Sequence, residues 1–77
     1  MGNECSAKNL LEIYRTRLRM AKKGTINVRP ELVAAMKRLV DGLSLRKSDS
    51  KIRLEMRNGK TQFIAEDDGS LIAEFDF

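Results

Sequence analysis

Histidine and cysteine, which often carry enzyme chemistry or hold metal ions, are nearly missing from this chain. It has 77 residues with no histidine, and Cys5 is its one cysteine. Without histidine a zinc site lacks its usual ligands, and a single cysteine forms no internal disulfide. No serine stands beside a recognisable base, and no glycine-rich loop of the phosphate-binding type is present. The sequence therefore predicts a protein that is not an enzyme and that uses no cofactor or metal ion.

The N-terminus carries the sharpest short motif of the chain. Residues 1–6, MGNECS, match the pattern for N-myristoylation of Gly2, and Cys5 is a plausible site for a second acyl chain. One acyl chain binds membranes only marginally, so Cys5 acylation or nearby cations would have to supply a second signal. An accidental match is the alternative, because the pattern constrains few positions. A lipidated peripheral membrane protein is the third functional hypothesis.

Cations predominate on one side of the segment at about residues 7–23, whose apolar residues have the spacing of an amphipathic helix. At about 100° per residue, four of them fall in a narrow sector beside the apolar stripe, namely Lys8, Arg15, Arg19 and Lys22. Such a strip attracts phosphates, and neutralisation by Lys and Arg supplies most sequence-independent affinity for nucleic acid. Against this, Glu12 lies within the strip and can pair with Lys8 or Arg15, and no aromatic residue stands among the cations to stack bases. Nucleic-acid binding is the second hypothesis, with a solvated helix face as its alternative.

Charge and hydrophobic period both change near Lys51. Residues 1–50 contain 11 Lys and Arg against 5 Asp and Glu, whereas residues 51–77 contain 4 against 6. Apolar residues recur at helical spacing in the first part and alternate in the second. We expect one small domain over residues 1–77, with a helical half at about 7–43, a linker at 44–50 and a β-meander at 51–77. A domain of this size buries only about 60% of its unfolded surface, so dimerisation would add stability.

The composition favours a folded protein in the cytoplasm. Hydrophobic residues make up 42% of the chain and charged residues 34%, as in ordinary globular domains. No apolar run approaches the roughly 18 residues of a membrane span. The N-terminus also lacks the basic region followed by an apolar stretch that a secretory signal has. We therefore expect a cytoplasmic location, with membrane contact only if the chain is lipidated.

Two helices are predicted in the first half. The first covers about residues 7–23, with Ser6 as its N-cap and Gly24 after its last turn. Pro30 suits the first turn of the second helix, and Gly42 is the expected end of that helix.

The second half predicts a three-stranded antiparallel meander. Asn58-Gly59 is the signal for a two-residue hairpin. At the next turn, a three-residue loop with Gly69 in the left-handed conformation keeps the apolar residues on one face. The expected fold is α+β in the order ααβββ, with both helices packed on one face of the sheet. The pairs expected across the second turn are Ala65 with Leu71, Phe63 with Ala73 and Thr61 with Phe75.

The same register places an apolar pair on the other face of the sheet. Ile64 lies beside Ile72 there, flanked by Arg53, and these three residues form the predicted protein interface. The first and third strands are both edges that offer strand addition, unless cations such as Arg53 and Arg57 guard the first one. The leading hypothesis is a protein-binding regulatory, inhibitory or adaptor domain. Its partner is another protein or a second copy of the chain, and no small-molecule substrate is indicated.

Overall fold

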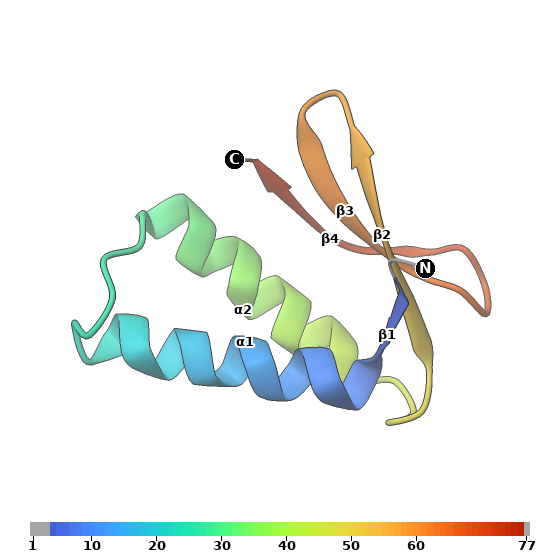
Figure 1. The fold of residues 1–77 in the computed structure, drawn as a ribbon, viewed down its shortest axis with the longest axis horizontal. Helices are drawn as coiled ribbons and strands as arrows, with labels where there is room; N and C mark the ends of the chain where they lie inside the picture. The colour runs from blue at the N-terminus through green and yellow to red at the C-terminus, as the bar shows by residue number, and fades with distance from the viewer. Residues whose placement is uncertain (1–3, 77) are drawn as a thin grey trace.

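The computed structural model describes residues 4–76, which form two helices and a four-stranded antiparallel sheet. Both helices lie on one side of the sheet (Figure 1). The α+β class is therefore confirmed, whereas the count of three strands is wrong. The elements in chain order are β1 (Glu4–Ser6), α1 (Ala7–Lys22), α2 (Pro30–Ser44), β2 (Lys51–Arg57), β3 (Lys60–Ala65) and β4 (Leu71–Asp76), and the strands are arranged β1-β2-β3-β4.

Strand β1 is the element that the sequence analysis did not predict. It has three residues, too few for an alternating pattern, and it forms only by pairing with a segment far along the chain. Cys5 lies opposite Ile52, and the backbone N–H of Ala7 donates to the carbonyl of Ser50 at 2.7 Å. Because β1 covers β2 only at residues 51–53, residues 54–57 of β2 have no strand beside them on that side among the described residues.

The signals at the helix ends act largely as expected. The Ser6 hydroxyl accepts a hydrogen bond from the Asn9 backbone N–H at 3.2 Å, and Gly24 has a φ of 77° just after α1. Helix α2 starts at Pro30 as predicted, but it continues to Ser44, so Gly42 does not end it.

Gly42 instead allows α2 to lie close against β4. A Cβ atom at position 42 would stand 2.6 Å from Cγ2 of Ile72, closer than two carbon atoms can approach without displacement. The glycine is therefore a packing residue inside the helix.

The core lies between the helices and the sheet. Its largest fully buried side chains are Leu39, Leu43, Ile52, Phe63 and Phe75. The Tyr14 ring of α1 meets the Phe63 and Phe75 rings edge-on, with centroids 5.7 Å away in each case. Such edge-to-face contacts stabilise by about 0.5–1.5 kcal/mol beyond the area they bury, so this aromatic cluster ties α1 to the sheet.

The β2–β3 hairpin has the predicted register. Asn58 and Gly59 both have positive φ, 54° and 76°, and Met56 lies opposite Thr61. Such a turn matches the right-handed twist of its strands, which is why Asn-Gly predicts it well.

The β3–β4 register is only partly as expected. Phe63 lies opposite Ala73 as predicted, but Ile64 lies opposite Leu71, so Ile72 is an extra residue at a bulge. The expected pairs of Ile64 with Ile72 and of Ala65 with Leu71 are therefore wrong. Gly69 has the expected left-handed φ of 71°, yet the bulge forms further along, where Ile72 can turn to the helix side and pack on the core.

Candidate functional site

The structure does not bring the three residues of the predicted protein interface together on an exposed face. Ile64 is only 9% exposed. Ile72 faces the helices because of the bulge and is half-buried against the core. Arg53 is engaged within the chain, since its Nη1 atom lies 3.1 Å from the Glu66 carboxylate and its Nε atom 3.6 Å from the Glu55 carboxylate. The surface that the sequence predicted is therefore not present as an apolar patch.

Several polar groups on that sheet face pair with one another. The Gln62 amide donates to one Glu74 carboxylate oxygen at 3.1 Å, and Lys60 Nζ lies 3.3 Å from the other. The Gln62 hydrogen bond first, and Lys60 second, lower the pKa of Glu74 below its ordinary value. The Glu74 carboxylate is therefore satisfied by groups of the same sheet face.

The cationic strip of α1 differs from that face. Lys8, Arg15, Arg19 and Lys22 are all exposed, and within residues 4–76 none of them forms an ion pair. The pairing of Lys8 or Arg15 with Glu12, which the spacing allows, is not observed. The strip is therefore an uncompensated positive surface, whereas two cations of the sheet, Arg53 and Lys60, are paired.

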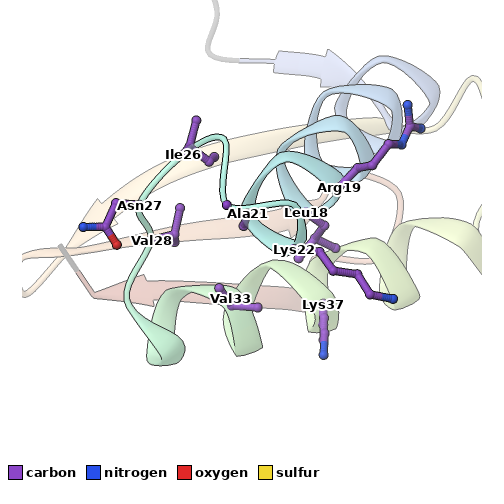
Figure 2. A pocket seen from close by; sticks show the side chains of 10 residues that line it. Leu18, Arg19, Ala21, Lys22, Ile26, Asn27, Val28, Val33 and Lys37 are labelled. Atoms are coloured by element: carbon purple, nitrogen blue, oxygen red, sulfur yellow. The ribbon is translucent and has the colours of Figure 1, made fainter.

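A groove opens where the strip reaches the end of α1. It lies between the last turns of α1, the loop of residues 23–29 and α2, and its volume is about 710 Å³. We name it the helical groove (Figure 2). Aliphatic side chains dominate its surface, and its complete lining is Leu18, Arg19, Ala21, Lys22, Gly24, Ile26, Asn27, Val28, Val33 and Lys37.

Three cations stand on the helix side of the helical groove. Figure 2 shows Arg19, Lys22 and Lys37 extending from the helices, across from the loop that carries Ile26. Lys37 extends the strip from α1 to α2, which brings residues far apart in sequence to one site. Like Arg19 and Lys22, it has no ion-pair partner within the described part of the chain. The groove thus combines an aliphatic floor with a positive rim.

The loop that closes the helical groove is held by hydrogen bonds near both of its ends. The Thr25 backbone N–H donates to the Met20 carbonyl at 2.9 Å, and Arg29 Nη2 donates to the Asp76 carbonyl at 3.3 Å. Val28 packs against the core, whereas Ile26 is half-buried without belonging to it. No role was predicted for this loop from the sequence, although its β-branched residues between two amphipathic helices were the available signal.

A second hollow of about 550 Å³ lies at the other end of α2. Two large apolar side chains line it while exposed to solvent, Leu45 at 89% and Leu71 at 53%. Arg46, which lines it, is paired, because its Nη1 atom lies 3.2 Å from Asp67 and its Nη2 atom lies 3.6 Å from Asp68. The hydroxyl and backbone N–H of Ser70 donate to Asp68, which lowers the pKa of that carboxyl below its ordinary value. Asp67 and Asp68 therefore stabilise the turn between β3 and β4.

The lipidation motif is only partly open to structural description. Gly2 lies outside the described residues, whereas Cys5 is half-buried in β1 beside Ile52. A half-buried sulfur is less accessible to an acyl donor than one on a free terminus. Neither α1 nor α2 has the length and apolar character that a membrane-crossing helix needs.

Comparison with known proteins does not assign this chain to a family. No family model matches it, and neither the curated proteins nor the solved structures include a significant match.

Proposed function

We propose that this chain is a non-enzymatic protein-binding module that recognises an acidic amphipathic segment of its partner through the helical groove. A regulatory, inhibitory or adaptor role fits such a module. The observation that carries the proposal is the conjunction of an aliphatic groove with three cations that lack ion-pair partners in residues 4–76.

The floor of the helical groove provides the apolar part of such recognition. Leu18, Val28 and Val33 pack on the core from one side and line the groove on the other. Their positions are therefore fixed before binding, which reduces the entropy that a partner must lose to order the site. Apolar side chains spaced along one face of a peptide are the usual anchors for a groove of this kind.

The rim of the helical groove selects the charge of the partner. Arg19, Lys22 and Lys37 are solvated cations, so each contributes about 0.2–1 kcal/mol to a pair with a carboxylate. They also accelerate encounter with an acidic segment and place its charged face toward α1 and α2. The groove lining contains no aromatic side chain on which a base could stack. Aliphatic anchors with acidic flanks therefore fit it better than a nucleic acid.

The test is a fluorescence anisotropy titration with a synthetic acidic amphipathic helix that carries Leu and Ile on one face and Glu on the other. We expect saturable binding that Lys22→Glu with Lys37→Glu weakens by at least about tenfold, since two attractions become repulsions. Ile26→Ser should weaken binding about threefold to tenfold without loss of fold, because Ile26 lines the groove but is not part of the core.

The matched control is Lys8→Glu with Arg15→Glu, which changes the net charge equally but lies outside the groove lining. It should retain most of the affinity. A peptide with the same composition but a permuted order, and therefore no apolar face, should bind at least tenfold more weakly. Equal losses in the two double variants, or equal binding of the two peptides, would contradict the proposal.

Nucleic-acid binding is the second candidate, and one observation favours it. The cationic strip is exposed along α1 and has no carboxylate partner among residues 4–76. Amide NMR titration with mixed-sequence duplex and single-stranded DNA tests it. Shifts around Lys8 and Arg15 that persist at physiological salt would favour this candidate, whereas shifts that salt removes would indicate non-specific attraction.

A further inference from the structure

Two large apolar side chains stand exposed at the second hollow. Leu45 follows directly after α2 and is 89% exposed, and Leu71 begins β4 and is 53% exposed. The hollow that they line has a volume of about 550 Å³, within the range of about 300–1,000 Å³ that is usual for sites enclosing a whole ligand. One patch therefore carries both a protruding leucine and a space large enough to receive one.

The walls of the second hollow are held by contacts within the chain. Ile72 packs against the core and lies close to Gly42. The Arg46 side chain is only 22% exposed, and its guanidinium donates to the Asp67 carboxylate at 3.2 Å and to the Ser70 hydroxyl at 3.0 Å. These contacts fix the aliphatic part of Arg46 as an apolar wall. A side chain that enters the hollow therefore meets a preformed surface, which lowers the entropy lost on binding.

Charges of both signs line the same patch. Lys47 is exposed, and the Asp67 side chain is 64% exposed although it pairs with Arg46. Such an exposed pair holds its carboxylate weakly, so Asp67 can accept a second cation. When two copies are related by a two-fold axis through the patch, Lys47 of each copy can face Asp67 of the other, and both contacts are attractive. The patch is therefore complementary to itself in charge as well as in shape.

We propose that a second copy of this chain occupies the second hollow, in a symmetric dimer in which each Leu45 enters the hollow of the other copy. Because the leucine and the hollow belong to one patch, two-fold pairing satisfies both and closes the assembly at two copies. An uncharged apolar segment would fill the hollow but would leave Lys47 and Asp67 unmatched, so a second copy fits the patch better. The inference does not depend on the proposed function, because the second hollow and the helical groove share no lining residue.

The first test is sedimentation equilibrium of the full chain from about 10 μM to about 1 mM, because two exposed leucines in each copy make a small interface with a dissociation constant of about 100 μM. Leu45→Ser should weaken dimerisation about tenfold or more without loss of fold, since this side chain is exposed in the single chain. The matched control is Met56→Ser, which makes a similar change at an exposed residue outside the hollow lining and should keep the dimer. Circular dichroism checks that each variant is folded.

Charge variants test the orientation of the two copies. Lys47→Glu and Asp67→Lys should each weaken dimerisation about threefold to tenfold, because two attractions become repulsions. An equal mixture of the two variants should form a heterodimer, since each then supplies the charges that the other lacks. This recovery separates a charge effect from damage to the turn that contains Asp67.

Contacts between the copies are observed directly by isotope-filtered NMR on a mixture of labelled and unlabelled chains. We expect nuclear Overhauser effects between the Leu45 methyls of one copy and the Leu71 methyls of the other. A chain that is monomeric at 1 mM would overturn the proposal and leave the hollow to a segment of another protein. A dimer that Leu45→Ser leaves unchanged, that Met56→Ser weakens equally, or whose intermolecular contacts lie elsewhere would also overturn it.

Discussion

Substitution of Gly42 by alanine offers a quantitative test of how α2 packs on β4. In an ordinary helix interior, alanine is more favourable than glycine by about 1 kcal/mol. Here the added Cβ would lie 2.6 Å from Cγ2 of Ile72. That methyl is bonded directly to a β-branched carbon whose χ1 is stiff, so the strand or the helix must move. Overpacking of this kind costs about 1–3 kcal/mol.

We therefore expect Gly42→Ala to lower the free energy of unfolding by up to about 2 kcal/mol, despite its better helix propensity. For a domain of this size, each kcal/mol corresponds to about 4–8 °C in melting temperature. Urea and thermal denaturation followed by circular dichroism measure the effect. If Gly42→Ala instead raised the stability by about 1 kcal/mol, as propensity alone predicts, the close approach of α2 to Ile72 would be wrong.

A double-mutant cycle isolates the contact. Ile72→Ala removes the methyl that the new Cβ would meet, so Gly42→Ala should become neutral or stabilising by up to about 1 kcal/mol in that background. Ile72→Val is the matched control, because it keeps both γ carbons on Cβ, including the methyl that the new Cβ would meet, and should keep Gly42→Ala destabilising. A coupling free energy below about 0.5 kcal/mol would mean that the two positions do not contact each other.

Two further predictions concern pH. The Ser70 hydrogen bonds first, and Arg46 second, hold the pKa of Asp68 below its ordinary value, so this group stabilises the fold above the unfolded pKa and loses that contribution as pH falls. Ser70→Ala should raise the Asp68 pKa, measured by carboxyl carbon NMR; an unchanged value would exclude the hydroxyl as a cause. Burial raises the pKa of Tyr14, against the opposing effect of Arg17, so stability should fall as pH rises above about 10. Tyr14→Phe should lessen that alkaline loss in urea denaturation, and an equal loss in both proteins would contradict this account.

Most of the local structure followed from signals that lie within a few residues of one another. Ser6 and Pro30 start the two helices because capping and proline geometry act within a single turn. Asn58 and Gly59 set the first hairpin because their positive φ values match the twist of the adjoining strands. The apolar stripe of α1 also correctly predicted which side of the helix faces the core.

Elements that depend on distant partners were not predicted. Strand β1 has three residues and forms only because Cys5 meets Ile52. The bulge at Ile72 turns this side chain toward α2, where Gly42 leaves space for it. The alternation of apolar and polar residues does not reveal where a bulge inserts an extra residue. The sequence therefore placed Ile64 and Ile72 on one face of the sheet, whereas in the structure they lie on opposite faces.

For the candidate site, too, some features followed from local sequence signals and others only from tertiary packing. By itself the sequence determined that α1 has a cationic side and that few residues suited to catalysis are present, because composition and helical spacing are local properties. Tertiary structure decided that Arg53 is paired and that Ile64 is buried. It also brought Lys37 to the cations of α1 beside the aliphatic groove. These features arise from packing between segments far apart in the chain, and no local pattern records such packing.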